Sequence, residues 1–517
     1  MRAPQPKISG TRDYTGDDAV ALRNAREAIA ATLRRYAYAA IDPPILESSA
    51  PFLNRSGEDI RRHMYIFADP GGREVCLRPE LTIPVCRAYL RQLQAAGETQ
   101  AVPERETRLR YFGPAFRYES ATEGHYRQFY QAGAELIGAK WPEAADAEIL
   151  AAALDAVEAA GIGRALVEIG DVEVRSAFID QLPIGERSRT RLRRLAFGTG
   201  TQASPAASAK QAIEAEQSNE FGELASLLAT VEPDKAELLI KEVFALADVR
   251  HVGGRTPEEI IERLTSRAAQ PAGELSPELT QGVLDLLKIR AKPAAAFDAV
   301  REHFRKFGIG SIDRVLERCE ARLRYFDAYR PKPAALMFNV GLRRGLEYYT
   351  GFLFEIYAAD LPNVGYLCGG GRYDNLLEGL GAPGSIPAVG FGIGLDRLLL
   401  ALPKSPAAEA TDMPVPYALV VATGTVRHEK CIKVSGLLRD AGWSVETDLS
   451  RRAEQTILNE AVTRKIPYVV LVGEKESSGD QVRIRRLGDR NEQLIGLNAL
   501  AGYAKGETVR QAAGGKT

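Results

Sequence analysis

Two neighbouring runs of the chain bring together the side-chain types that bind a nucleotide. Arg117 and Glu119 are two residues apart, so they share one face of a predicted strand. Arg127, Phe129 and Gln131 share a face of the next predicted strand. An arginine neutralises a phosphate, an aromatic ring stacks on a purine, and a carboxylate accepts a hydrogen bond from an exocyclic amine. The pattern indicates a nucleotide site, and the alternative is a solvated hairpin with surface ion pairs.

A glycine-spaced run near residue 390 reads GFGIGLDR and ends in Asp396 and Arg397. A dinucleotide-binding loop also spaces its glycines in this way. That loop requires a strand, a helix and a second strand around it, with a further acidic residue downstream, and the sequence supplies neither. The dinucleotide interpretation is therefore disfavoured.

Composition limits the remaining classes of protein. Lys and Arg total 67 against 68 Asp and Glu, so binding of nucleic acid requires local basic patches rather than a global positive field. The five cysteines form no C-x-x-C pair, which favours a reducing cytoplasm over a disulfide framework. No signal-like or membrane-spanning apolar run is present, and we expect no membrane partner. With five histidines and no H-E-x-x-H, we expect no metal bound by the protein alone.

The elements that position these residues follow from periodicity and turn signals. Apolar residues three or four apart predict a helix from Asp17 to Tyr36, and the letters DPGG at 69 to 72 predict a hairpin. Residues 108 to 119 and 126 to 138 predict a second, longer hairpin. An Ala-rich helix opens at Pro142, and a strand follows that ends near Asp171.

The larger organisation is of the α+β class, with an antiparallel sheet flanked by helices, a mostly helical insertion, and a C-terminal domain in which strands and helices alternate. The predicted divisions are a core first part at 1–175, the insertion at 176–325, a core second part at 326–403, a linker at 404–416, an α/β domain at 417–507 and a tail at 508–517.

Three stretches resemble the signature motifs of class II aminoacyl-tRNA synthetases. Residues 116–119 (FRYE) followed by 127–129 (RQF) resemble the second motif. Residues 43–47 (PPILE) resemble the first, dimer-forming motif, and 390–397 resemble the third. The resemblance implies the class II synthetase fold, a homodimer, and a C-terminal anticodon-binding domain.

Further stretches are similar to the histidine-specific branch of this class. They are RGLEYYT at 344–350, GGGRYD at 369–374, LRPELT at 77–82 and QAGAE at 131–135. The resemblance implies a histidine–tRNA ligase, which activates histidine with ATP to histidyl-adenylate and transfers the histidyl group to tRNA(His). It implies ATP and Mg²⁺ as cofactors, with Mg²⁺ carried by the ATP phosphates.

The resemblance also assigns roles to individual residues. For catalysis it implies three arginines, which are Arg117, Arg344 and Arg397. For ATP binding it implies Arg117, Glu119, Arg127, Phe129 and Arg397. For histidine binding it implies Glu80, Thr82, Gln131, Glu135, Tyr349 and Tyr373. Cations aimed at developing phosphate charge are what an adenylate-forming reaction needs.

Other stretches resemble a non-catalytic relative, the histidine-sensing regulatory subunit of ATP phosphoribosyltransferase, whose partner is a short catalytic chain. They are residues 57–62 (GEDIRR), 82–84 (TIP) and 129–133 (FYQAG), together with His125 and Glu347 at positions where synthetases carry other residues. The three arginines and the domain at 417–507 favour the ligase.

Overall fold

The structure, a computed structural model, describes residues 8–53, 63–95, 97, 105–197, 277–330, 335–344, 348–402, 417–424, 428–450, 452–464, 466–473, 480–488 and 491–514. The chain divides into two compact units, one of Met1–Tyr14 and Ala21–Lys404 and the other of Thr15–Val20 and Ser405–Thr517. The predicted linker and the motif at 57–62 lie outside the described residues, as do Gly345 to Glu347.

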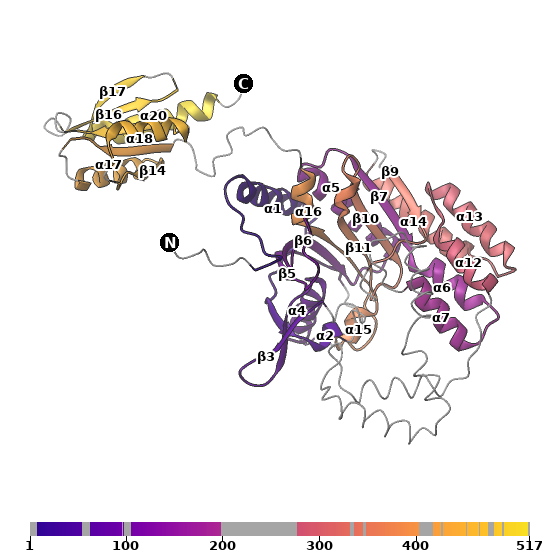
Figure 1. Cartoon of the computed structure of the whole chain (residues 1–517). Helices are drawn as coiled ribbons and strands as arrows, with labels where there is room; N and C mark the ends of the chain where they lie inside the picture. Colours follow the sequence, from indigo (N-terminus) through magenta and orange to yellow (C-terminus); the bar gives the residue numbers. More distant parts are fainter. Residues whose placement is uncertain are drawn as a thin grey trace. The chain divides into compact units, whose positions relative to one another are not determined.

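A nine-stranded sheet forms the centre of the first unit (Figure 1). The order of its strands is β1 (Ala39–Ala40), β5 (Thr107–Phe116), β6 (Gln128–Ile137), β12 (Ala388–Gly394), β11 (Tyr366–Arg372), β10 (Phe352–Ala358), β7 (Ala165–Asp171), β9 (Ala335–Asn339) and β8 (Arg290–Ala291). All neighbours are antiparallel except β1 with β5 and β7 with β9. The predicted fold class is confirmed, and so is the long hairpin, which is β5 and β6.

One face of this sheet packs against helices. Helix α5 (Pro142–Ala159) contacts β6, β10, β11 and β12, and its alanines let it approach the strands closely. Helix α14 (Asp313–Tyr329) lies against α5, and α16 (Leu395–Ala401) follows β12. Helix α1 (Asp17–Arg35) contributes Ala25, Ile29 and Leu33 to the same core.

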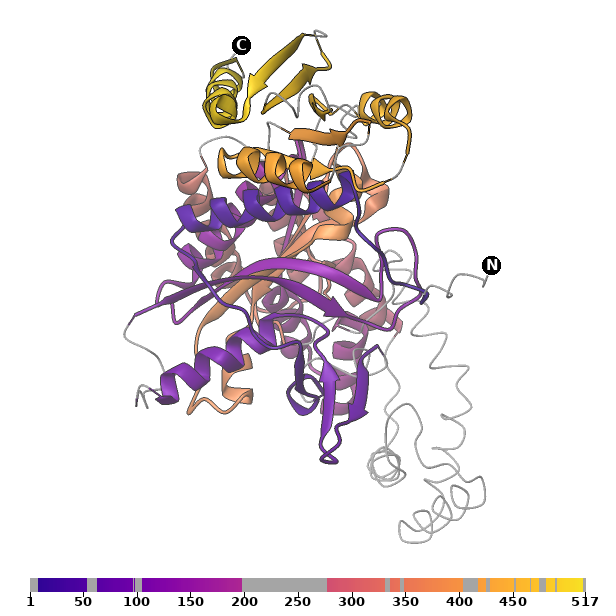
Figure 2. The same cartoon turned by 90° about the vertical axis from the view of Figure 1, so that its left-hand side faces the viewer.

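Smaller elements surround the opposite face. A three-stranded sheet has the order β2 (Leu46–Ser48), β4 (Glu74–Leu77) and β3 (Tyr65–Ala68). Its β3–β4 hairpin is the one predicted at residues 69 to 72, and it projects away from the large sheet (Figure 2). The short helices α2 (Ala50–Leu53) and α15 (Leu376–Gly379) and the longer α4 (Thr82–Ala95) complete a second hydrophobic core.

The described parts of the predicted insertion are mainly helical, and residues 198–276 lie outside them. They comprise α6 (Val172–Gln181), α7 (Glu186–Phe197), α12 (Pro277–Leu287) and α13 (Pro293–Lys306). Helices α7 and α12 lie side by side although about eighty residues separate them, and Figure 1 shows this group at one end of the unit. Helix α14 crosses residue 325, so the predicted end of the insertion falls inside a helix.

The second unit is a five-stranded sheet with helices on both faces. Its order is β14 (Ser444–Thr447), β13 (Tyr417–Ala422), β15 (Tyr468–Val472), β16 (Gln481–Arg486) and β17 (Glu492–Gly496), with α17 (His428–Asp440), α18 (Glu454–Thr463) and α20 (Leu497–Gly514). Separate hydrophobic cores line the two faces. Helix α20 continues past residue 507 into the predicted tail. Within the described residues of both units, no helix is sufficiently long and apolar to span a bilayer.

Candidate active site

Strand register places the predicted pocket residues on the face of the large sheet opposite α5. Gln131 and Glu135 lie on β6 with Phe129, and they pair with Gly394, Gly390 and Ala115 on the neighbouring strands. Because side chains alternate, Phe129, Gln131 and Glu135 all point to the same side. The predicted grouping of Phe129 with Gln131 is therefore confirmed.

Glycines cover much of this face and leave room for side chains to lie flat across the strands. A Cβ atom on Gly369 would sit 1.4 Å from Arg344 Nη1, and one on Gly390 would sit 1.5 Å from Glu135 Oε2. A Cβ on Gly392 would sit 2.4 Å from Gln131 Nε2. The glycine-spaced run therefore serves close packing of pocket side chains.

Two of the three predicted catalytic arginines converge on one tyrosine ring. The guanidinium carbon of Arg397 lies 4.0 Å from the centroid of the Tyr366 ring, and that of Arg344 lies 5.1 Å from it. The Arg397 guanidinium, with Arg344 beside it, holds the pKa of Tyr366 below its usual value despite burial. Arg344 also pairs with Glu355 at 3.4 Å, and burial raises the pKa of that carboxyl.

Tyr366 and Glu355 were not singled out from the sequence, and a strand irregularity explains why Tyr366 was missed. Glu355 pairs with Gly369, but Tyr357 pairs with Tyr366, so the register shifts between these two pairs. The extra residue in β11 turns Tyr366 to the face of Gly369. Strict alternation would have placed it on the opposite face.

The third arginine lies beside the predicted purine platform. Arg117 has its guanidinium carbon 5.6 Å from the Phe129 ring centroid, and its Nε donates to the Pro79 carbonyl at 2.9 Å. Glu119 is 4.0 Å from Arg117. The structure thus brings together a cation, a ring and a carboxylate, as the sequence predicts.

Arg127 differs from this group. Its guanidinium carbon lies 4.2 Å over the Tyr118 ring, and its Nε donates to the Glu119 carbonyl at 3.2 Å. His125, in the loop between β5 and β6, has its pKa lowered by burial and by the positive charge of Arg397. The contacts of Arg127 with the Tyr118 ring and the Glu119 carbonyl therefore hold the two ends of this loop together.

The predicted histidine-binding residues form a buried polar group around Glu135. The Thr82 hydroxyl donates to Glu135 Oε1 at 2.8 Å, and the Tyr373 hydroxyl donates to Oε2. Burial raises the pKa of Glu135 to about 8. Gln131 Oε1 is buried without a hydrogen-bond partner, so it is an acceptor available to a ligand.

Glu80 caps helix α4. Its carboxylate accepts hydrogen bonds from the backbone N–H groups of Thr82 at 2.6 Å and Ile83 at 2.8 Å. Burial raises the pKa of Glu80, and these two donors act in the opposite direction. The cap fixes Thr82 in the position from which it reaches Glu135.

Three tyrosine rings pack against one another beside Glu135. The Tyr348 ring lies 4.8 Å from Tyr349 and 5.6 Å from Tyr373, and Tyr349 lies 6.5 Å from Tyr373. Arg344 is 5.9 Å from the Tyr349 ring, which connects the tyrosines to the arginines. Tyr348 was not among the predicted site residues, although it directly precedes Tyr349.

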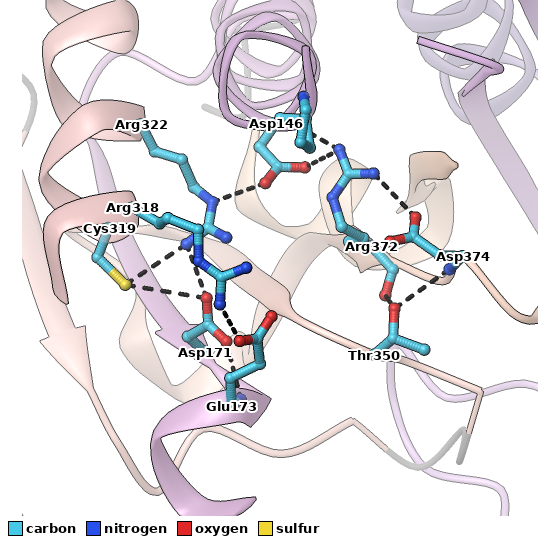
Figure 3. A network of polar contacts seen from close by, with 10 residues as sticks. Asp146, Asp171, Glu173, Arg318, Cys319, Arg322, Thr350, Arg372 and Asp374 are labelled. Carbon is cyan, nitrogen blue, oxygen red and sulfur yellow. Dashed lines mark hydrogen bonds and ion pairs between the residues drawn. The ribbon is translucent and has the colours of Figure 1, made fainter. Parts of the chain in front are cut away.

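A buried network of ion pairs and hydrogen bonds holds in place the segments that carry Tyr349 and Tyr373 (Figure 3). Asp146 on α5 lies between Arg322 of α14 and Arg372 of β11, and it binds each at 2.6 Å. Arg372 also binds Asp374 at 2.9 Å, and the backbone N–H of Asp374 donates to the Thr350 hydroxyl at 3.1 Å. The network thus secures the residues that flank Tyr349 and Tyr373.

The sequence of the second unit also offers a candidate RNA-facing patch of six arginines, and its described members make internal ion pairs; the six are Arg451, Arg452, Arg483, Arg485, Arg486 and Arg490. Arg452 pairs with Glu460, Arg485 binds Glu492 at 2.6 Å, and Arg486 pairs with Glu507. Arg451 and Arg490 of the same predicted patch lie outside the described residues. A basic RNA-facing patch stays a prediction.

Comparisons with protein families match both units. The family model for histidyl-tRNA synthetase matches residues 10–247 and 245–398 of this chain. The family model for the anticodon binding domain matches residues 410–507.

Individual proteins match over almost the whole chain. The histidine–tRNA ligase of Methanocaldococcus jannaschii is 30% identical over 96% of this chain and 99% of its own length. Among solved structures, histidyl-tRNA synthetase from Nostoc sp. PCC 7120 is 19% identical with a TM-score of 0.62, covering 98% of this chain and 100% of that one. An ATP phosphoribosyltransferase regulatory subunit/histidyl-tRNA synthetase from Bacillus halodurans is 20% identical with a TM-score of 0.59, covering 88% and 96%. At these identities the two solved structures show the fold alone.

Proposed function

This chain belongs to the histidyl-tRNA synthetase family, and from that premise we propose how its pocket joins histidine to tRNA. The function is that of a histidine–tRNA ligase, which uses ATP. The observation that supports our assignment of roles is the convergence of Arg344 and Arg397 on the Tyr366 ring, next to the tyrosine-lined group around Glu135.

In the proposed mechanism, the histidine carboxylate attacks the α-phosphate of ATP, and pyrophosphate leaves. Arg117 and Arg344 stabilise the charge on the α-phosphate, and Arg397 binds the distal phosphates. Phe129 stacks on the adenine, where Glu119 accepts a hydrogen bond from the exocyclic amine. These assignments are supported by the proximity of Arg117 to Phe129 and of Arg344 to Arg397 around one ring.

For the amino acid, we propose that Glu135 and Tyr373 face the imidazole, with Tyr349 beside them. Glu80, Thr82 and Gln131 surround the ammonium. The unpartnered Gln131 oxygen and the buried Glu135 carboxylate support this arrangement, because buried polar atoms require partners. An analogue without ring nitrogens would leave Glu135 without a ligand donor.

Replacement of Glu135 by Gln is expected to raise the KM for histidine roughly tenfold to a hundredfold, because one carboxyl oxygen that can accept a hydrogen bond from the imidazole becomes an amide nitrogen that can only donate. The KM for ATP should change little. The amide still pairs with the hydroxyls of Thr82 and Tyr373, so the fold is retained. Histidine-dependent exchange of pyrophosphate into ATP measures both constants.

The matched control for this change is Glu148→Gln, which alters a buried carboxylate that binds Tyr38 and Arg108 instead. Equal changes in the histidine KM of the two variants would contradict the proposed role of Glu135.

Replacement of Gly369 by Ala is expected to lower kcat at least about a hundredfold, since the new methyl group occupies the position of the Arg344 guanidinium. The displaced atoms are the far end of a flexible side chain, so the protein should still fold. The control is Gly163→Ala, where an added Cβ meets no atom within 4 Å. Steady-state exchange kinetics together with thermal melting distinguish lost catalysis from lost stability.

The anticodon-domain match and the full-length relatives favour the ligase over the histidine-sensing regulatory subunit. The deciding experiment is histidine-dependent exchange with pure protein, followed by charging of tRNA(His). Absence of exchange, combined with activation of a short ATP phosphoribosyltransferase catalytic chain, would reverse the assignment.

Finer features belong to the same proposal. We propose a homodimer, supported by the exposed Ile45 and Leu46 at the edge strand β2, and sedimentation analysis tests it. We propose that Mg²⁺ binds with the ATP phosphates, whose oxygens would supply most of its ligands. A cytoplasmic location is supported by five unpaired, buried cysteines. The domain divisions given above are part of this proposal.

A further inference from the structure

The segment from Ile8 to Tyr14 lies against the second predicted motif. The Gly10 carbonyl accepts hydrogen bonds from the backbone N–H groups of Arg127 at 2.7 Å and Gln128 at 3.3 Å. Gly10 has a φ of +81°, and a Cβ atom there would meet Arg127 Cγ at 2.5 Å. This part of the segment is therefore held closely beside the start of β6.

The segment ends in Tyr14, a half-buried residue whose ring contacts two other side chains. The Arg12 guanidinium carbon lies 4.9 Å from its centroid, and the Tyr130 ring meets it edge-on at 5.7 Å. The Tyr14 hydroxyl donates a hydrogen bond to Asp396 Oδ1. Tyr14 thus connects the segment to the first turn of α16.

Asp396 is a buried carboxylate with two donors from different parts of the chain. It is 2% exposed, and its second oxygen accepts from the backbone N–H of Tyr130 at 2.9 Å. Burial raises the pKa of Asp396, and the bond from Tyr14 opposes that rise. Without the Tyr14 hydroxyl, Asp396 Oδ1 would lose the hydrogen bond that it accepts from the segment Ile8 to Tyr14.

Arg397 is the next residue, and its position depends on this turn. Its guanidinium lies over the Tyr366 ring and close to Gly394, where an added Cβ would be 3.4 Å from Arg397 Nε. A small displacement of the backbone at residues 396 and 397 would therefore move the guanidinium from its position over the Tyr366 ring.

We propose that Tyr14 is a positioning residue for ATP, which acts through Asp396 to hold Arg397 at the distal phosphates. The proposal rests on the proposed function of Arg397. It distinguishes Tyr14 from Tyr36, another half-buried tyrosine, whose hydroxyl donates to Asp155 at 2.7 Å in a contact that includes none of the proposed site residues.

The test compares Tyr14→Phe with the matched control Tyr36→Phe in the full-length chain. Tyr14→Phe is expected to raise the KM for ATP roughly tenfold, while kcat and the KM for histidine stay near the wild-type values. Tyr36→Phe should leave all three constants unchanged. In an Asp396→Asn background, Tyr14→Phe should cause no further rise, because the two residues act as one unit.

A second measurement does not depend on catalysis: the dissociation constant for ATP in the absence of histidine, obtained from the thermal stabilisation that ATP produces. An unchanged ATP KM in active Tyr14→Phe protein, or an equal change in Tyr36→Phe, would overturn the role of Tyr14. If the wild-type protein shows no exchange but binds ATP, and Tyr14→Phe weakens that binding, the ligase assignment is wrong and the positioning role of Tyr14 is retained. Wild-type protein that binds no ATP would overturn both.

Discussion

Replacement of Arg344 by Ala is expected to reduce the kcat of histidine-dependent pyrophosphate exchange about a thousandfold, with little change in the KM for ATP. The expected pattern follows from the proposed action on the transition state, where negative charge at the α-phosphate is greatest. Arg344→Lys should recover only a small part of the loss, since an ammonium does not reproduce the flat, forked set of N–H donors. Exchange of radiolabelled pyrophosphate into ATP, measured at saturating histidine and ATP, gives kcat.

The same substitution also removes the partner of a buried carboxylate, so stability requires a separate control. Glu355 binds Arg344 at 3.4 Å and also accepts a hydrogen bond from the Tyr357 hydroxyl at 2.5 Å. Its raised pKa makes it easier to protonate when the cation is removed. The double variant Arg344→Ala/Glu355→Gln removes the stranded charge. Recovery of exchange in that double variant would show that Arg344 serves stability, contrary to our proposal.

Replacement of Asp146 by Ala is expected to cost about 3 kcal/mol or more of unfolding free energy, because it leaves two buried guanidinium groups without their shared anion. Arg322 retains Asp171 at 2.7 Å and Arg372 retains Asp374 at 2.9 Å, which limits the loss. Scanning calorimetry of the full chain should show a midpoint lowered by several degrees. Since Tyr373 lies between Arg372 and Asp374, the KM for histidine should also rise.

The control for this prediction lies on the same helix. Asp155 binds Arg330 at 2.9 Å, but its side chain is 32% exposed, and Arg330 keeps a second partner in Glu158. Asp155→Ala should therefore cost only about 1 to 2 kcal/mol, from the loss of one partly exposed ion pair and of the hydrogen bond that the Tyr36 hydroxyl donates. Comparable losses of unfolding free energy in the two variants would mean that the buried network in Figure 3 stabilises the protein no more than a partly exposed ion pair does.

Local sequence determined several parts of this protein. Period-two alternation grouped Phe129 with Gln131, and the strand register confirms that they share a face. The hairpin at residues 69 to 72 forms where Asp69 accepts hydrogen bonds from the backbone of Gly71 and Arg73. Such features depend on neighbouring residues alone, so one stretch of sequence is enough to predict them.

Tertiary structure decided the rest. Tyr366 faces the arginines only because β11 carries an extra residue opposite β10, and the letters of β11 do not mark that position. Asp146 joins Arg322 and Arg372, which are 176 and 226 residues away in the chain. Many acidic and basic residues are available as partners in the sequence, and only the packing of α5, α14 and β11 selects these three. Partner choice between distant charges is a property of the folded packing, whereas alternation and turns belong to the local backbone.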